Sequence, residues 1–173
     1  LKMKWESIEC PIFDKMVNDQ PDISDDPDVK LVFYGLHGSL HYPVQEDSIH
    51  TAVCDVGASG SGKSQILNVV SATFSEEAIG TINCGEVVFG KTAFLTKEVI
   101  IDTDVPEDMI RRFGKTFFQK AVSGEKVPIP VKFQKQEEFI QIKQRMLMSS
   151  QYRQNIPDTG EIARRIAYFN FRP

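Results

Sequence analysis

Apolar and polar residues follow two different periods along this chain of 173 residues. Four segments have the apolar, β-branched composition that is typical of strands. These segments are residues 49–56, 79–89, 95–101 and 139–148. Residues 65–74 and 109–122 instead place apolar side chains three and four positions apart, which predicts two amphipathic helices. Strands that alternate with helices predict an α/β fold whose central, mostly parallel sheet is flanked by helices.

The N-terminal part of the chain is less regular. Residues 1–20 have helical spacing that is interrupted at Pro11, and this pattern predicts a docking helix. Residues 20–28 are acidic and contain two prolines, so they predict a loop or linker. Residues 30–34 are apolar and aromatic, and we expect a short strand there.

These patterns divide the chain into two parts. We expect an N-terminal helix with an acidic linker over residues 1–29 and a core over residues 30–173. The sequence begins at a leucine and ends in Phe-Arg-Pro, so we also expect it to be a fragment of a longer protein.

The most specific feature is the run Gly-Ala-Ser-Gly-Ser-Gly-Lys-Ser at residues 57–64. It fits the phosphate-binding pattern G-x-x-x-x-G-K-[ST], and it lies between a predicted strand and a predicted helix, as that loop requires. In such a loop the backbone N–H groups and the helix N-terminus face the phosphates of a nucleotide, while lysine reaches the β and γ oxygens and the hydroxyl binds Mg²⁺. The candidate nucleotide-binding residues are Gly57, Ala58, Ser59, Gly60, Ser61, Gly62, Lys63 and Ser64.

Two later segments predict polar groups at the ends of strands. The strand over residues 95–101 runs into Asp102 and Asp104, and alternation along a strand would place both carboxylates on one face. Acids at the edge of a parallel sheet can hold Mg²⁺ and orient an attacking water, and which acid has which role stays open. The strand over residues 139–148 runs into Ser-Ser-Gln, which makes Gln151 a candidate contact for the γ-phosphate.

Residues 124–135 alternate lysines with apolar residues and contain two prolines. Proline is excluded from central strands, so we expect an edge hairpin. One interpretation is that the lysines and an aromatic ring grip a nucleic-acid backbone; the other is that a charged edge prevents aggregation. The candidate DNA-binding residues are Lys126, Lys132, Phe133 and Lys135.

Charge is unevenly distributed along the chain. The net charge is −4, but residues 1–110 hold 7 Lys/Arg against 19 Asp/Glu, whereas residues 111–173 hold 13 against 5. A basic C-terminal third fits a nucleic-acid surface, and it equally fits a solvated helix face with a few nucleotide-contacting arginines. No stretch approaches the roughly 18 apolar residues of a membrane span. Three cysteines without a C-x-x-C pair favour a reduced, intracellular protein.

The order of these features resembles a known family. The phosphate loop, acid-terminated strand, G-E-x-V-x-I-x-V-K hairpin, serine-rich strand end, I-P-D-T-G and R-R-I-x-x-F-x-F are similar to the superfamily 3 helicases of DNA viruses. The likeness is greatest to the helicase portion of the primase-helicases of large nucleocytoplasmic DNA viruses. It covers roughly residues 30–173.

The resemblance implies an AAA+ P-loop NTPase core with a β-hairpin insertion. Such domains assemble into rings, usually hexamers, around single-stranded DNA, and they move along it by hydrolysing ATP with Mg²⁺. A viral role further implies the host-cell cytoplasm or a viral replication site. The candidate catalytic residues are Lys63, Asp102, Asp104, Gln151, Arg164 and Arg165, the last two in the region of the arginine finger that completes a neighbour's site. The candidate metal ligands are Ser64, Asp102 and Asp104.

The chain departs from the family pattern at two positions. Gln151 stands where the family usually has asparagine, and Thr103 separates two acids that are usually adjacent. Two other functions also fit the phosphate loop. One is a small-molecule, nucleoside-type kinase, although such enzymes usually begin closer to the loop. The other is a nucleotide-gated assembly module without helicase action.

Overall fold

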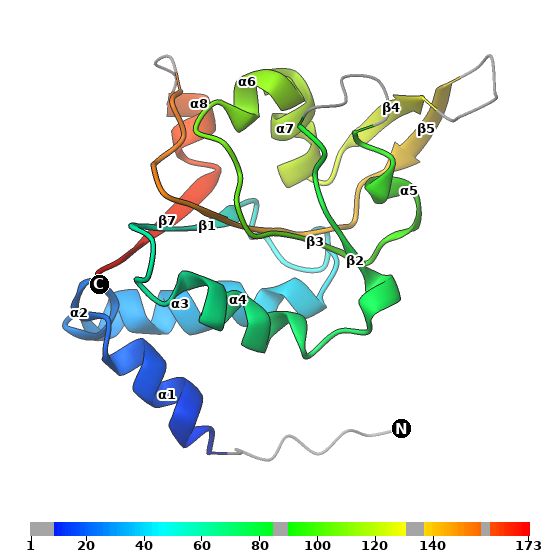
Figure 1. Cartoon of the computed structure of the whole chain (residues 1–173). Helices are drawn as coiled ribbons and strands as arrows, with labels where there is room; N and C mark the ends of the chain where they lie inside the picture. The colour runs from blue at the N-terminus through cyan, green and yellow to red at the C-terminus, as the bar shows by residue number, and fades with distance from the viewer. Residues whose placement is uncertain (1–8, 85–89, 131–136, 157–159) are drawn as a thin grey trace, which may run out of the picture.

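The computed structural model describes residues 9–84, 90–130, 137–156 and 160–173 of the chain (Figure 1). Five strands form a parallel sheet in the order β2-β3-β6-β1-β7. Their bounds are Ala52–Gly57 for β1, Ile79–Gly80 for β2, Val99–Asp102 for β3, Met146–Ser150 for β6 and Ile166–Phe171 for β7. The predicted α/β fold with a mostly parallel central sheet is confirmed.

Helices cover both faces of this sheet (Figure 1). One face carries α5 (Ala93–Thr96), α6 (Met109–Phe113), α7 (Lys115–Val122) and α8 (Gly160–Ala163). The other carries α1 (Pro11–Asn18), α2 (Pro21–Ser24), α3 (Pro27–Gly38) and α4 (Lys63–Ser71), and two short 3₁₀ turns lie at Ser39–His41 and Glu76–Ala78. Each face of the sheet has its own hydrophobic core. Along β1, Cys54 and Val56 belong to the core that includes α6 and α7, and Val53 belongs to the core that includes α3 and α4. Because successive side chains of a strand point to opposite faces, a strand that is buried on both sides has a continuous apolar sequence.

The N-terminal region differs from the prediction. The prediction of a strand at residues 30–34 is wrong, because these residues lie inside helix α3. Asp26 caps that helix, since its carboxylate accepts hydrogen bonds from the backbone N–H groups of Asp28 at 2.9 Å and Val29 at 3.4 Å. Phe33, Leu36 and Leu40 are buried at helical spacing, and this period outweighs the β-prone composition of the segment. The expected loop over residues 20–28 contains α2 and the start of α3, which crosses the predicted domain boundary at residue 29.

Two predicted strands are shorter than expected. Only Ile79–Gly80 of residues 79–89 form a strand among the described residues, and 85–89 lie outside them. The Ile82 N–H bonds to the Asp102 carboxylate at 3.0 Å instead of continuing the ladder. In the segment 95–101 the strand begins only at Val99, because the preceding apolar residues form the end of helix α5, whose Phe94 packs against a cluster of aromatic rings.

Two further segments are each divided in the structure. The helix expected over residues 109–122 is broken at Gly114, whose φ of 95° ends α6 and starts α7. The strand expected over residues 139–148 is two strands, β5 (Glu137–Gln141) and β6. The chain passes between two sheets there, and the buried Arg145 anchors the crossing by donating to the carbonyls of Tyr42 at 2.9 Å and Ile49 at 3.1 Å.

A hairpin is present as predicted, but its second strand begins at Glu137, beyond the expected residues 124–135. Strand β4 (Lys126–Pro130) pairs with β5 in an antiparallel, two-stranded sheet. Val127 and Ile129 are buried, whereas Lys126 and Pro128 are exposed, which is the alternation of a half-covered strand. Lys132, Phe133 and Lys135 lie outside the described residues. Within the part of the chain that the structure describes, no helix is both long and apolar enough to cross a membrane.

Candidate nucleotide-binding site

The predicted phosphate-binding loop connects β1 to α4, which is the position that the sequence predicts. Gly60 and Gly62 have positive φ angles of 81° and 93°, which side chains other than glycine rarely adopt. Gly57 is needed for a different reason. A Cβ atom at this position would lie 2.3 Å from the carbonyl oxygen of Phe171, the β7 residue that is paired with it. The loop is therefore fitted closely against the end of β7.

Lys63 folds back onto its own loop. Its ammonium group donates to the carbonyl oxygens of Gly57 at 2.5 Å and Ala58 at 2.9 Å and to the Ser61 hydroxyl at 3.2 Å. The residue is only 7% exposed. Burial lowers the pKa of Lys63, and the negative charges of Asp104 and Asp55 oppose that shift.

A buried acid lies behind the loop. Asp55 of β1 is completely buried, and its Oδ2 lies 3.4 Å from Nε2 of His37 on α3. The other carboxylate oxygen has no hydrogen-bond partner among the described residues. Nδ1 of His37 lies 2.8 Å from the carbonyl oxygen of Phe33, so α3 holds the imidazole in place. Burial raises the pKa of Asp55, and the hydrogen bond from His37 opposes this shift. Sequence reasoning missed this pair because nothing local connects residues 37 and 55.

A cavity of about 720 Å³ opens beside the loop. It lies beyond the carboxyl ends of the parallel strands, where ligands bind in open α/β sheets. Eight of the predicted site residues line it together: Ser59, Gly60, Ser61, Gly62, Lys63, Ser64, Asp104 and Gln151. Its other lining residues come from the start of α4, from the positions just before Asp104 and Gln151, from the corner between α1 and α2, and from the C-terminal end of the chain; they are Gln65, Thr103, Ser149, Ser150, Asp19, Gln20, Arg172 and Pro173.

The two candidate acids have different surroundings. Strand β3 ends at Asp102, so the alternation of side chains along a strand does not extend to Asp104. Asp104 is exposed and lines the cavity. Asp102 is not part of that lining, and its Oδ2 accepts the N–H of Ile82 at 3.0 Å. Burial raises the pKa of Asp102.

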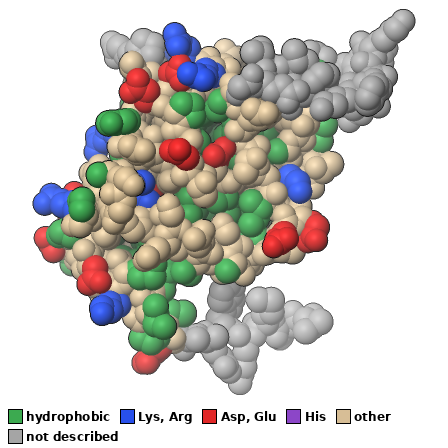
Figure 2. Space-filling view, viewed as in Figure 1, with side chains coloured by type: hydrophobic (Ala, Val, Ile, Leu, Met, Phe, Trp, Pro, Cys, Tyr) green, Lys and Arg blue, Asp and Glu red, His purple; other side chains and the backbone are tan. Residues whose placement is uncertain are grey.

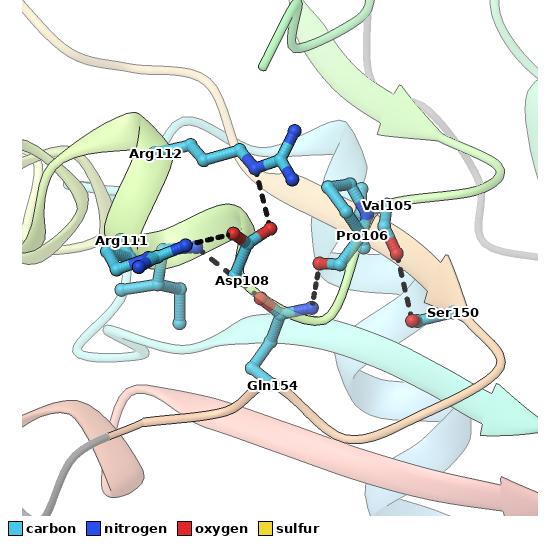
Figure 3. Close-up of polar contacts among 8 residues, drawn as sticks. Val105, Pro106, Asp108, Arg111, Arg112, Ser150 and Gln154 are labelled. Atoms are coloured by element: carbon cyan, nitrogen blue, oxygen red, sulfur yellow. Dashed lines mark hydrogen bonds and ion pairs between the residues drawn. The ribbon is translucent and has the colours of Figure 1, made fainter. Parts of the chain in front are cut away.

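Side chains at the end of β6 hold the loop that follows β3 (Figure 3). The Ser149 hydroxyl donates to the Thr103 carbonyl at 2.6 Å, and the Ser150 hydroxyl donates to the Val105 carbonyl at 2.9 Å. Buried Gln154 extends this contact by donating to the Pro106 carbonyl at 2.9 Å. The segment that carries Asp104 is therefore bonded directly to the segment that carries Gln151. Gln154 was not predicted, because a glutamine in a polar run has no distinguishing pattern.

A cluster of charges adjoins Gln154 at the start of α6. Asp108 lies 2.6 Å from Arg111 and 2.6 Å from Arg112, and both arginines are exposed (Figure 3). On the face seen in Figure 2, acidic and basic side chains of the described residues are interspersed. Lys126, the one candidate DNA-binding residue whose position is described, is exposed at the start of β4.

The structure does not bring the two candidate finger arginines to the cavity. Arg164 and Arg165 precede β7, whereas the cavity lies beyond the other end of that strand. A strand of six residues spans roughly 20 Å at about 3.3 Å per residue. Arg164 is exposed. Arg165 is half-buried and donates to the Glu161 carbonyl at 2.7 Å and to the Ser123 hydroxyl at 3.3 Å.

The donor groups at the cavity suit Mg²⁺. The Ser64 hydroxyl and the Asp104 carboxylate line the same space, and Mg²⁺ in nucleotide sites is held by one or two protein oxygens together with phosphates and waters. Among the described residues, no group of three or more His, Cys, Asp or Glu side chains is placed to hold a metal ion by itself. A metal bound here would therefore depend on the nucleotide for its remaining ligands.

The parallel sheet, the strand–loop–helix at residues 52–71 and the polar strand ends define an α/β fold with a P-loop-like core. Two solved structures of the NrS-1 C-terminal region are similar to this chain, with TM-scores of 0.68 and 0.70 at 19% and 16% identity. They are matched over 99% and 98% of this chain and 40% of theirs. A JCV helicase structure is similar with a TM-score of 0.53 at 12% identity, over 96% of this chain and 46% of that one.

These likenesses establish the fold, and the chain spans less than half the length of each of these structures. No protein-family model and no curated protein sequence matches the chain.

Proposed function

We propose that this chain is the motor portion of an ATP-dependent DNA helicase that replicates a viral genome. One observation carries the proposal: Lys63, Ser64, Asp104 and Gln151, which come from three separate segments, line one cavity of about 720 Å³. That cavity lies at the carboxyl edge of a sheet whose fold is shared with a JCV helicase structure. The protein would act inside the host cell, in the cytoplasm or at a viral replication site.

The side chains around the cavity suggest distinct roles in ATP hydrolysis. Lys63 exchanges its bonds to the loop carbonyls for bonds to the β and γ oxygens of ATP. Ser64 and Asp104 hold Mg²⁺, which when bound neutralises phosphate charge. Gln151 orients the attacking water. We assign the metal-binding role to Asp104, because the carboxylate of Asp102 accepts a hydrogen bond from the backbone N–H of Ile82.

A second subunit would complete the site. Arg164 is exposed at the end of β7 that is remote from the cavity, so it is placed to meet a neighbouring copy. Arg165 is held by Glu161 and Ser123 of its own chain, so Arg164 is the better candidate for the finger. Repetition of this contact closes a ring, which we propose is a hexamer. The arginine stabilises charge that develops on the transferred phosphoryl group.

The hairpin is a candidate DNA-binding element that is linked to the same site. Residues 142–145 join β5 directly to β6, and Gln151 follows the end of β6 at the cavity. A change at the γ-phosphate can therefore be transmitted along β6 to the hairpin. We propose that Lys126, together with Lys132, Phe133 and Lys135, grips the backbone of single-stranded DNA and moves with each hydrolysis event.

Mixing two inactive variants of the full-length protein tests the shared site. Lys63→Ala and Arg164→Ala should each abolish ATP hydrolysis. In mixed rings, some interfaces pair an intact Lys63 from one variant with an intact Arg164 from the other, so part of the activity should return. Arg165→Ala serves as the matched control and should leave at least part of the activity. Absence of recovery in assembled mixed rings would disprove the split site.

A comparison of activators tests the DNA-dependent function. Single-stranded DNA should accelerate ATP consumption, and Lys132→Ala should remove this stimulation while leaving basal hydrolysis. Stimulation that survives the substitution would refute the role of the hairpin. Acceleration by a nucleoside, with transfer of phosphate to it, would identify a small-molecule kinase instead.

A further inference from the structure

We infer that Gln20 is a positioning residue of the phosphate-binding loop. Its side-chain amide joins the corner between α1 and α2 to the loop and to the C-terminal end of β7, and so sets the geometry of the phosphate contacts. This inference rests on the proposed nucleotide-binding function. It assigns a role at the site to the segment that the sequence marks only as an acidic linker.

Both polar atoms of the Gln20 amide are hydrogen-bonded. Its Nε2 donates to the carbonyl oxygen of Ser61 at 3.1 Å, and its Oε1 accepts the backbone N–H of Arg172 at 2.8 Å. The side chain is 8% exposed and lines the cavity. Only an amide of this length offers one donor and one acceptor in these two directions, because a carboxylate lacks the donor and an ammonium lacks the acceptor.

The contact with Ser61 fixes a peptide plane of the loop. The carbonyl of Ser61 and the N–H of Gly62 belong to one planar peptide group and point in opposite directions. Holding the carbonyl on Gln20 therefore directs the Gly62 N–H away from Gln20. A Cβ atom at Gly62 would lie 3.8 Å from the Gln20 amide nitrogen, which places that side chain beside the left-handed turn that starts α4. Backbone N–H groups of this turn are the ones that contact phosphates in such loops.

Ser61 also connects Gln20 to the lysine. The buried Ser61 hydroxyl accepts a hydrogen bond from Lys63 at 3.2 Å, so the carbonyl and the hydroxyl of one residue are held by Gln20 and Lys63 respectively. Displacement of this residue would alter both the peptide that presents Gly62 and the lysine that reaches the phosphates.

The corner that carries Gln20 is firmly anchored. Val17 on α1 and Ile23 on α2 are completely buried in the core. Asp22 accepts from Nε of Arg172 at 3.0 Å, which adds a second contact between the corner and the end of β7. Figure 1 shows α2 beside the C-terminal end of the chain. The amide of Gln20 is thus attached to a rigid support on one side and to the loop on the other.

The experiment measures binding of Mg²⁺–tripolyphosphate and MgATP to the full-length protein by calorimetry. Tripolyphosphate has no base or ribose, so it reports on the phosphate loop alone. Gln20→Met keeps the volume and removes both hydrogen bonds, and affinity for both ligands should fall by about tenfold, the equivalent of one to two net hydrogen bonds. Gln20→Glu keeps the acceptor for Arg172 and loses the donor to Ser61. This variant should bind both ligands at least as weakly as Gln20→Met does. The control Ser24→Ala removes a hydrogen bond to the Asn18 carbonyl in the same corner and should bind normally.

Unfolding midpoints measured without ligand separate this role from a purely structural one. A lower midpoint with unchanged affinity for tripolyphosphate in either Gln20 variant would overturn the inference and leave the proposed function standing. If Gln20→Met does not fold, Gln20→Glu decides the question by the same criterion. A wild-type protein that binds neither ligand would overturn the proposed function and this inference together.

Discussion

Replacement of Gly57 by alanine is the most direct test of how the loop is fitted to the sheet. The added Cβ atom would lie 2.3 Å from the carbonyl oxygen and 3.1 Å from the carbonyl carbon of Phe171, and 2.9 Å from the Ser61 hydroxyl. The Ser61 side chain can rotate, but the Phe171 atoms are backbone. Strand β7 pairs with β1 along its whole length, so it cannot move away without losing ladder hydrogen bonds.

Overpacking in a rigid environment typically lowers the free energy of unfolding by about 1–3 kcal/mol. We expect Gly57→Ala to lower it by about 3 kcal/mol or more, because backbone atoms must move. The matched control is Gly35→Ala. Gly35 lies inside α3, and nothing lies within 4 Å of a Cβ built there. That change should stabilise the protein by roughly 0.5–1 kcal/mol through helix propensity.

Urea unfolding followed by circular dichroism gives both free energies. If Gly57→Ala unfolds within about 0.5 kcal/mol of wild type, the usual range for substitutions without structural consequence, the close fit of the loop to β7 is refuted.

Two further substitutions test the helix and the buried acid that support the loop. Asp26→Ala should lower the free energy of unfolding by about 1 kcal/mol, because the backbone N–H groups of Asp28 and Val29 lose their cap, and an unchanged urea midpoint would contradict this assignment. Asp55→Asn tests the raised pKa of the buried carboxyl. A pKa that is higher in the folded state than in the unfolded state means that folding favours the protonated carboxyl. The contribution of this carboxyl to the free energy of unfolding is therefore complete below about pH 4, and it is lost as the pH rises through the folded-state pKa. The stability of the variant relative to wild type should therefore increase with pH, by up to about 1.4 kcal/mol per unit; a decrease would show that pairing with His37 and Lys63 outweighs burial.

The parts of the site that could be predicted from sequence are those that depend on local geometry. The phosphate loop is defined by glycines and a lysine at fixed spacing, and the polar ends of β3 and β6 follow directly from apolar runs. The separation of Asp102 from Asp104 was not predictable in the same way, because side chains alternate only inside a strand and β3 ends at Asp102.

Other features depend on contacts that no local pattern records. Gln20 bonds to Ser61 and Arg172, which are 41 and 152 positions away in sequence. The error at residues 30–34 has a different origin. Their composition favours a strand, but the cap at Asp26 and the burial of Phe33 at helical spacing against the sheet determine the structure.

The ammonium group of Lys63 is already coordinated by oxygens of its own chain. Capture of an incoming anion must then proceed as a ligand exchange, in which carbonyl dipoles release the cation while phosphate takes it over. In stopped-flow mixing, the observed rate should level off at high nucleotide concentration, at the rate at which the lysine leaves its internal partners.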